Sequence, residues 1–502
     1  MNATPDRSAL AAAVAALDLL DLAGRRWYVA RNGVPSSASL AHAFALADDA
    51  VLALVDVRSD DAAARGTADR YAIPFVRTGE GWREAAEGDG AWRALAAAIA
   101  EGRTIPALAP GGQAAASGPG GAAGGGQVAA ALVCRPSPGF ADVWGAPARA
   151  LADAAETPLG RDQSNTSVVL GDRLLLKGYR RIQAGLNPDL ELTAYLSEEA
   201  AFPGVPRLAG WAEVVTREAG AATLAMLQEF VAHAEDAYEK VAEFIADLVA
   251  APGTPSLEWA TEVAADLGTM TAGLHSALAT PPPDAPDLAP REATRDELRA
   301  WRVDAHRQLN LAIPAVAAVD REASKELERA ASAIAARVSR FEAVATTPMV
   351  MRIHADLHLG QVLVADDGYR VIDFEGEPLR PIEERRRPDS PLRDVASLLR
   401  SLDHVARSAR RRAARREGAA DPPGLDVDAW IERARERFLA AYLGELRRAG
   451  ASITVDLDLL DAFEVAKECY EFVYAATVLP SWLWAPREGM RWLLTHGEVS
   501  DA

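Results

Sequence analysis

The sequence predicts an α+β protein in which a β-rich lobe precedes a mostly helical lobe, with an additional small α/β domain ahead of both. Short β-type runs separated by turn residues predominate up to about residue 232, and apolar residues spaced three and four apart predominate after it. The 502 residues allow two to four domains, and we expect the divisions 1–150, 151–232 and 233–502. A hydrophobic fraction of 49% with 25% charged residues is typical of a folded chain and excludes disorder throughout.

The N-terminal domain is predicted from short apolar segments. Residues 10–17 predict an amphipathic helix, because acidic residues on both sides distinguish it from the core of a signal peptide. Three apolar runs predict strands of one sheet: 51–57, 71–76 and 128–134. The glycine-rich stretch 111–126 cannot bury a core and predicts a loop inside this domain.

The second domain begins with a predicted hairpin. Residues 166–170 and 173–177 are β-type runs on either side of a Gly-Asp pair, which is typical of a tight turn. A helix is predicted from Asn187, with proline in its first turn. The apolar run 224–231 predicts a further strand that leads into a connector.

From about residue 235 the pattern is helical. The segments with helical spacing are 235–250, 258–278, 293–312, 320–344, 391–416, 427–448 and 457–478. Two short β-type runs, 350–353 and 370–374, interrupt them around a polar loop. Residues 407–416 include six arginines, which predict the solvated face of a helix; the alternative is an anion-binding patch.

Charge and cysteine content exclude several classes of protein. The formal net charge of −19 argues against a general role in binding nucleic acids, whose phosphates such a chain would repel. Every window of about 20 residues contains charge or proline, so no membrane-spanning helix is expected. Cys134 and Cys469 lack CxxC spacing and are expected to be buried free thiols. These features predict a protein of the cytoplasm.

The polar loop 354–361, followed by Asp373, carries the strongest chemical pattern in the sequence. The carboxylate of Asp356 could accept the proton of an incoming hydroxyl group. Oxygen atoms of Gln361 and Asp373 suit Mg²⁺, which prefers oxygen ligands. The combination favours phosphoryl transfer, a reaction that needs positioning and charge neutralisation more than covalent help.

Two other interpretations of this loop remain open. One is a polar connection between edge strands that has no chemical role. The other is a zinc site, because His354, Asp356 and His358 alternate along an extended segment. No cysteine or further histidine follows nearby to complete such a site.

Lys177 ends an apolar strand, where an ammonium group is costly unless it is paired or exposed. Glu191, on the next predicted helix, is its expected partner, and such a pair can anchor the phosphates of a nucleotide. The polar segment 163–167 before this hairpin has no glycine-rich motif, but it could offer N–H and hydroxyl groups to phosphates. The alternative for Lys177 is a surface position at a strand end.

Several segments together resemble the maltokinases of actinobacteria. They are 162–169, Lys177, 187–191, 228–231, 354–361, 372–378 and 382–395. The resemblance covers about residues 150–490 and is weaker at 26–29. It implies a protein-kinase-like, two-lobed fold of the aminoglycoside-phosphotransferase type with an N-terminal cap domain. It also implies that ATP and Mg²⁺ are used to convert maltose into maltose 1-phosphate. A partner enzyme of trehalose and glycogen metabolism is a docking candidate for the cap.

The resemblance assigns roles to individual residues. Asp356 would be the catalytic base, Gln361 and Asp373 the metal ligands, and Glu375 a neighbour of the metal or the sugar. The residues implied at the nucleotide are Ser164, Asn165, Thr166, Ser167, Lys177, Glu191, Gln228, Glu229, Phe230 and Val231. The last four resemble the hinge that contacts adenine.

The acceptor site is expected beside a C-terminal helix. The residues implied there are His358, Arg393, Tyr470, Glu471, Tyr474 and Trp482. Aromatic rings can stack on the C–H faces of a sugar, and Glu471 could take a hydroxyl or an ammonium group. The alternative for each tyrosine is packing on one helix face.

The sequence departs from the maltokinase pattern in two places. Ala355 stands where the family has glycine, which is tolerable unless the position needs a positive φ. Ala475 and Leu479 replace a glutamate and an arginine of the family, and this stretch resembles related enzymes that phosphorylate glucosamine. The expected activity is that of a maltokinase, with a glucosamine kinase giving glucosamine 6-phosphate as the alternative. A pseudokinase-like binding module is the alternative outside enzymes. The joint presence of Lys177, Glu191, Asp356, Gln361 and Asp373 disfavours it.

Overall fold

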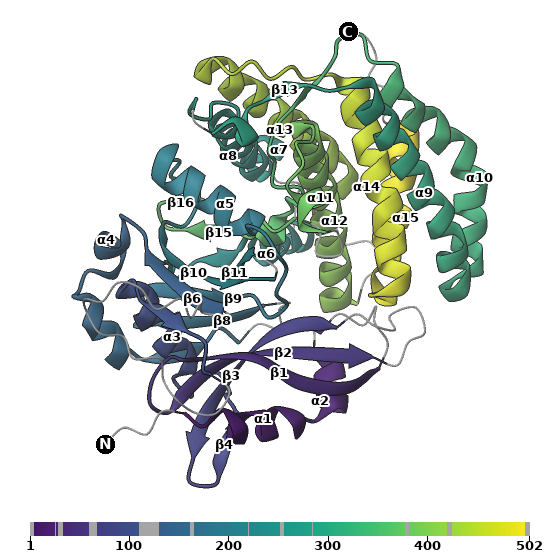
Figure 1. Ribbon diagram of the computed structural model, residues 1–502. Helices are drawn as coiled ribbons and strands as arrows, with labels where there is room; N and C mark the ends of the chain where they lie inside the picture. The colour runs from purple at the N-terminus through teal and green to yellow at the C-terminus, as the bar shows by residue number, and fades with distance from the viewer. Residues whose placement is uncertain are drawn as a thin grey trace. The chain divides into compact units, whose positions relative to one another are not determined.

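The structure is a computed structural model. It describes residues 5–25, 27–28, 34–59, 68–109, 130–160, 165–218, 220–251, 256–283, 285–376, 381–418 and 424–496, so the predicted loop 111–126 lies outside it. Contacts divide the chain into two compact units. The first comprises Met1–Glu198 and Pro206–Ala232, and the second comprises Glu199–Val205 and His233–Ala502. The large sheets belong to the first unit and the long helices to the second (Figure 1). Among the described residues, no helix has the length and apolarity needed to cross a bilayer.

An antiparallel sheet of four strands, in the order β1-β2-β3-β4, opens the first unit. Its elements are α1 (Arg7–Ala15), α2 (Leu19–Gly24), β1 (Pro35–Ala45), β2 (Ala50–Ser59), β3 (Asp69–Thr78) and β4 (Gly81–Glu84). Both helices contact β1. The predicted helix at 10–17 and the predicted strands at 51–57 and 71–76 are therefore confirmed.

Strand β2 is apolar on both faces because its side chains alternate between two cores. Val51 and Val55 pack with Leu10 of α1. Leu52 and Leu54 point the other way, into a second and larger cluster. This burial on both sides accounts for the nearly continuous apolar run in the sequence.

A second sheet has seven strands in the order β5-β6-β10-β11-β9-β8-β7. The strands are β5 (Thr104–Pro106), β6 (Ala130–Pro136), β7 (Glu156–Pro158), β8 (Thr166–Leu170), β9 (Leu174–Gly178), β10 (Leu208–Thr216) and β11 (Gly220–Glu229). The run at 128–134 was expected in the sheet of β2 and β3, and this expectation is wrong: β6 pairs with β10. Strands from both sides of residue 150 thus share one sheet, and the domain limits expected from the sequence stay predictions.

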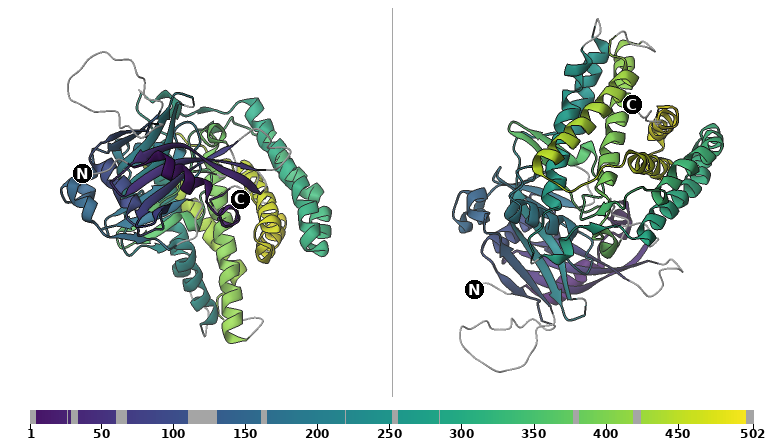
Figure 2. Two further views of the ribbon diagram at one scale, coloured as in Figure 1. Left: turned by 60° about the horizontal axis from the view of Figure 1, so that its bottom comes forward. Right: turned by 90° about the horizontal axis from the view of Figure 1, so that it is seen from above.

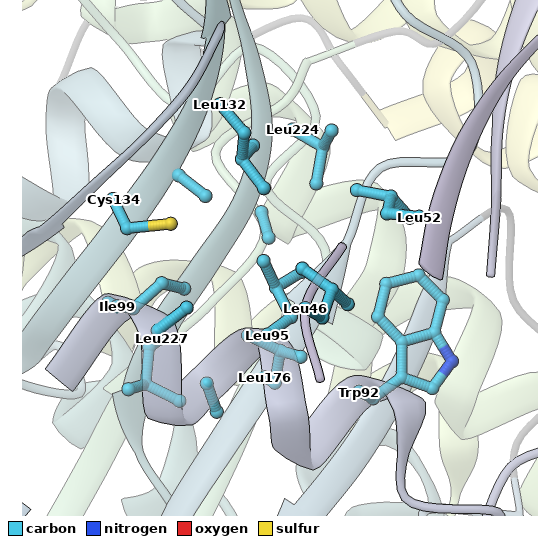
Figure 3. Packing of buried hydrophobic residues seen from close by; sticks show 14 of the residues in the cluster. Leu46, Leu52, Trp92, Leu95, Ile99, Leu132, Cys134, Leu176, Leu224 and Leu227 are labelled. Carbon is cyan, nitrogen blue, oxygen red and sulfur yellow. The ribbon is translucent and has the colours of Figure 1, made fainter. Parts of the chain in front are cut away.

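Helix α3 (Ala91–Ala100) lies in the larger core of this unit and was not predicted. Figure 3 shows Trp92, Leu95 and Ile99 of α3 close to Leu176 and Leu227 from the seven-stranded sheet. Full burial of an apolar side chain of this size contributes about 1.5–3 kcal/mol. Because α3 is buried on most sides, its sequence has no polar face that would have revealed a helix.

The β8–β9 hairpin matches its prediction. Gly171 and Asp172, in the three-residue turn between Leu170 and Leu174, both have φ near +56°, a left-handed conformation that glycine and aspartate tolerate well. At the other end of β9, a Cβ on Gly178 would lie 2.6 Å from the ring of Trp92. Glycine therefore lets the strand end, next to Lys177, approach the core closely.

The second unit is built from long helices. They are α6 (Ala237–Ala250), α7 (Leu257–Ala260), α8 (Glu262–Leu278), α9 (Arg295–Val319), α10 (Arg321–Val338), α11 (Ile382–Arg385), α12 (Pro391–Glu417), α13 (Val427–Ala449), α14 (Leu457–Thr477) and α15 (Trp484–His496). Helices α8 and α13 lie side by side, as do α9 and α10 (Figure 2). The predicted helices are confirmed, except that 258–278 is divided at Thr261 and 320–344 is α10 followed by a single short turn. Helix α15 was not predicted.

Helix starts in this unit carry side-chain caps that were visible in the sequence. The capping residues are Asp236, Thr294, Asp320, Ser390, Asp426 and Asp456. Two small antiparallel sheets complete the unit. One has the order β12 (Glu235–Asp236), β15 (Val362–Ala365) and β16 (Gly368–Val371), and the other pairs β13 (Arg291–Glu292) with β14 (Met349–Val350). The inserted segment Glu199–Val205 joins this unit, since Gly204 O accepts a hydrogen bond from the N–H of Val371 at 2.7 Å.

The arginines at 407–416 lie on α12 and join helices of the second unit. Arg407 is buried, and its Nε donates to Asp403 at 2.7 Å. Arg411 pairs with Glu488 of α15 at 3.0 Å, and Arg412 pairs with Glu239 of α6 at 2.8 Å. The interpretation as a solvated face is therefore wrong for the buried Arg407, whereas Arg411 and Arg412 stay partly exposed while they pair with neighbouring helices.

Both cysteines are buried free thiols, as predicted. Burial raises the pKa of Cys134 and of Cys469 to about 12. These thiols are therefore protonated and unreactive at neutral pH.

Candidate active site

The loop 354–361 is held by a carboxylate from another helix. Asp394, fully buried in the first turn of α12, accepts backbone hydrogen bonds from His354 (2.8 Å) and Ala355 (2.9 Å). His275 Nε2 lies 3.4 Å from the same carboxylate. Asp394 was not singled out from the sequence. Its signal there is an aspartate on the apolar side of a predicted helix, where a charge needs buried partners.

His354 joins this loop to the end of β16. Its Nε2 lies 3.0 Å from Ile372 O, and its Nδ1 accepts the backbone N–H of Asp356 at 3.3 Å. Its ring also packs against Phe374, with centroids 4.8 Å apart. Both ring nitrogens are engaged, so neither offers a lone pair to zinc, and the geometry does not support the zinc interpretation.

Asp356 follows on this loop and faces Lys467 of α14, with 3.6 Å between Oδ1 and Nζ. Burial would raise the pKa of Asp356, but the Lys467 ammonium group and the nearby ring of His358 outweigh it and hold the pKa below its usual value. Burial lowers the pKa of His358. Asp356 is therefore ionised at neutral pH, as a group that receives a hydrogen bond from a substrate hydroxyl must be.

Gln361 and Asp373 are brought together, as their spacing predicted. The Gln361 amide nitrogen donates to Asp373 Oδ2 at 3.2 Å. Gln361 makes this contact with its amide nitrogen. Its carbonyl oxygen and the Asp373 carboxylate are both oxygen ligands, which Mg²⁺ prefers. Glu375 lies two residues further on, and Arg385 of α11 donates to its backbone oxygen at 2.9 Å.

Ala355 has a φ of +69°, the left-handed conformation that favours glycine. The condition under which the alanine would be strained is therefore met. The strain lies directly between His354 and Asp356, where the Asp394 hydrogen bonds hold the backbone. Its effect on activity remains a prediction.

We expect Ala355→Gly to be as stable as the original chain or up to about 1 kcal/mol more stable, because relief of the left-handed strain exceeds the entropic cost of glycine. Ala355→Val should lose about 1–2 kcal/mol, because a β-branched residue tolerates this conformation least. Urea unfolding of the full chain measures both. A glycine variant less stable than Ala355→Val would contradict this account of the loop.

Two hollows of the second unit meet at Ala355. A narrow pocket of about 30 Å³ is lined in part by Ala355, Arg393, Lys467 and Tyr470. A larger cavity of about 390 Å³ shares Trp301, Ala355 and Arg393 with it. Since Asp356 is the next residue in the chain, the pair of hollows forms a candidate acceptor site beside it.

The predicted acceptor residues divide into two groups. Arg393 and Tyr470 line the narrow pocket, and Glu471 pairs with Lys467 at 3.0 Å. Tyr474 is exposed on α14, and Trp482 packs against the rings of His404 and Trp484. Neither Tyr474 nor Trp482 lines the two hollows described here, and their roles stay predictions.

In the first unit, Lys177 of β9 forms an ion pair with Asp189 of α5 (Pro188–Ala194), with 2.8 Å between Nζ and Oδ2. Both side chains are buried, and Tyr179 also bonds to Asp189 at 3.0 Å. The surface alternative for Lys177 is thus wrong. Glu191 lies half-buried two residues after Asp189, and its pairing with Lys177 stays a prediction.

The other residues predicted at the nucleotide lie at strand ends of the first unit. Ser164 falls outside the described residues, Asn165 is half-buried, and Thr166 and Ser167 are buried at the start of β8. Thr166 Oγ1 accepts a hydrogen bond from Arg180 at 2.7 Å. This contact favours the backbone, more than the threonine hydroxyl, as the part that could meet a phosphate.

The predicted hinge covers the last two residues of β11 and the two residues after it. Gln228 is buried, Glu229 pairs with Arg207 at 2.9 Å, and the N–H of Phe230 donates to Arg173 O at 2.8 Å. Val231 is half-buried. Because the N–H of Phe230 is already engaged, hydrogen bonds to adenine would have to come from other backbone groups of the hinge.

Comparison with known protein families matches residues 155–450 to the "Phosphotransferase enzyme family". The chain belongs to this family. A protein named glucosamine kinase from Streptacidiphilus jiangxiensis is 31% identical over 435 residues, which is 86% of each chain. A glucosamine kinase from Mycolicibacterium smegmatis is 31% identical over 343 residues, covering 68% of this chain and 80% of the relative. Neither relative is named a maltokinase.

Solved structures agree with this assignment. A glucosamine kinase in complex with glucosamine, ADP and inorganic phosphate matches with a TM-score of 0.67 at 26% identity, over 97% of this chain and 99% of that one. A second crystal form of glucosamine kinase gives a TM-score of 0.71. The phosphotransferase therefore has the kinase-like fold that was predicted, with a β-rich lobe, a helical lobe and an additional N-terminal sheet.

Proposed function

We propose that this phosphotransferase is an ATP-dependent sugar kinase that phosphorylates a hydroxyl group of glucosamine or of a hexose of the same size. The observation that carries this proposal is the match, over nearly the full length of both chains, to a glucosamine kinase with glucosamine and ADP bound. The ionised Asp356 beside a small pocket supports it. Maltose, the acceptor implied by the sequence resemblance, has less support because the relatives found are named glucosamine kinases.

In the proposed reaction, the hydroxyl of the bound sugar donates a hydrogen bond to Asp356. Asp356 takes its proton as the oxygen attacks the γ-phosphorus of ATP, and the bond from the γ-phosphorus to the bridging oxygen breaks to release ADP. Gln361 and Asp373 are the residues that would hold Mg²⁺. When bound, the metal neutralises charge on the transferring phosphoryl group. Asp394 and His354 keep the backbone on either side of Ala355 in place, so that Asp356 is already oriented.

We expect Lys177→Ala to raise the KM for ATP at least about tenfold, because phosphates lose a cationic anchor. The change also leaves the Asp189 carboxylate buried without this partner and should cost about 3–5 kcal/mol of stability. The double variant Lys177→Ala with Asp189→Asn separates the two effects. It should recover much of the stability but not the affinity for ATP, and recovery of both would remove Lys177 from the nucleotide site.

The proposal is tested by a coupled ADP-release assay with Mg²⁺-ATP against glucosamine, glucose, N-acetylglucosamine and maltose. The Asp356→Asn chain serves as the blank. Turnover of a monosaccharide above this blank is the expected result. Preference for maltose would instead favour the maltokinase alternative. Tight ATP binding without transfer to any of these sugars would favour a binding module that has lost catalysis.

A further inference from the structure

The narrow pocket beside the loop contains an ammonium group. Lys467 lies on the face of α14 that lines this pocket, with its Nζ 3.6 Å from Asp356 and 3.0 Å from Glu471. The same nitrogen lies 4.9 Å from the centre of the Tyr470 ring, a cation–π contact. Its side chain is 17% exposed. A hydroxyl group that bonds to Asp356 Oδ1 would therefore come close to the Lys467 ammonium group.

Lys467 can make only one kind of hydrogen bond to a substrate. A lysine ammonium group donates hydrogen bonds and accepts none. A sugar hydroxyl can accept from Lys467, whereas a protonated amine can only donate and carries the same charge. Inside a small, partly buried pocket, repulsion between two like charges is felt across the whole pocket. Glu471, a carboxylate that could take a hydroxyl or an ammonium group of the substrate, is already paired with Lys467.

Other charged groups lie near Lys467. The carboxylate of Asp304 lines the same pocket and is paired with Arg307. Burial lowers the pKa of His358 and favours its neutral ring. Arg393, also at the pocket, is paired with Asp389 at 2.8 Å. His404 Nε2 lies 3.1 Å from Oε1 of Glu468, the residue that follows Lys467 on α14. Lys467 is thus the cation that lies between the base and Glu471, and removing its charge shifts the local potential in one direction only.

We propose that Lys467 is a specificity-determining residue that selects an acceptor carrying a hydroxyl or another uncharged hydrogen-bond acceptor where it faces α14. The inference rests on the proposed sugar kinase function and names its substrate class, which is neutral hexoses ahead of hexosamines. It departs from what the names of the relatives suggest and so can be tested against them.

Glucose and glucosamine are matched probes, because they differ only in a hydroxyl or an ammonium group at one carbon. We expect the full chain to prefer glucose. In Lys467→Met, the ratio of kcat/KM for glucosamine to kcat/KM for glucose should rise about tenfold, and at least threefold. Both sugars use the same base, so an indirect effect of the substitution on Asp356 cancels in this ratio. Lys467→Gln, which keeps a donor but loses the charge, should move the ratio in the same direction.

Lys240→Met is the charge-matched control, since Lys240 lies exposed on α6 and pairs with Glu235. It should leave the ratio unchanged. Calorimetric affinities of the same two sugars in the presence of ADP measure the selectivity without turnover. If no sugar is phosphorylated, the proposed function fails, while the binding ratio still decides the role of Lys467. An original chain that prefers glucosamine, or a ratio that moves less than threefold in both variants, overturns the inference.

Discussion

Replacing Asp356 by asparagine should lower kcat about 10²- to 10⁴-fold while the chain stays folded. Asparagine keeps the shape of the side chain but cannot take a proton from the attacking hydroxyl. The fold should survive because Lys467 keeps its closer partner, Glu471, at 3.0 Å. Coupled ADP release at saturating ATP and sugar gives kcat, and circular dichroism on heating checks the fold.

Asp366→Asn is the matched control for this experiment. Asp366 is exposed in the turn between β15 and β16, on the same stretch of chain but away from the pocket. Its turnover should equal that of the original chain. Near-normal turnover by Asp356→Asn would sink the assignment of Asp356 as the base.

Removal of the Asp394 carboxylate should lower both the stability of the chain and its kcat. Asp394→Ala leaves the buried N–H groups of His354 and Ala355 without their acceptor, which should cost about 2–4 kcal/mol of stability. The loop would relax, and a misplacement of about 1 Å at Asp356 can cost about 10²-fold in kcat. Asp394→Asn keeps one acceptor oxygen, so its stability and its kcat should lie between those of the original chain and those of Asp394→Ala. Urea unfolding and kcat are measured on the same preparations.

Asp426→Ala provides a control with the same number of backbone bonds. Asp426 caps α13 by accepting from two N–H groups, but it is exposed and distant in sequence from the loop. Its loss should cost about 1 kcal/mol and leave kcat unchanged. If Asp394→Ala were no more harmful than Asp426→Ala in either measurement, Asp394 would not be the anchor of the loop.

Elements that depend on neighbouring residues could be predicted from the sequence. The β8–β9 turn rests on two adjacent residues that tolerate a positive φ, and the helix starts rest on caps within one turn. Helix α3 escaped because an almost wholly buried helix has no polar face to set its period. The sheet to which β6 belongs escaped because strand partners are chosen by long-range packing.

The candidate site divides in the same way. Asp356, Gln361 and Asp373 lie near one another in the sequence, so their spacing could be recognised there. The hydrogen bond between Gln361 and Asp373 confirms that these two side chains meet. Asp394 and Lys467 act on the loop from separate helices, so no spacing in the sequence connects them with it. The partner of Lys177 could be predicted only in part. The sequence indicated Glu191 on the following helix, and the structure shows a contact with Asp189, half a turn earlier on that helix.

The short segment Glu199–Val205 has a consequence for how this chain can be made and varied. It belongs to the helical unit, yet segments of the other unit precede and follow it in the sequence. Its carbonyl at Gly204 is bonded to Val371, and a Cβ on Gly273 would lie 3.2 Å from the ring of Phe202. During synthesis this segment leaves the ribosome before Gly273 and Val371, so it cannot make these contacts until the later residues have been added. A gene divided at residue 232 would separate it from them permanently. The helical unit therefore cannot be exchanged between relatives as one contiguous block of sequence, because its residues Glu199–Val205 are encoded within the sequence of the other unit.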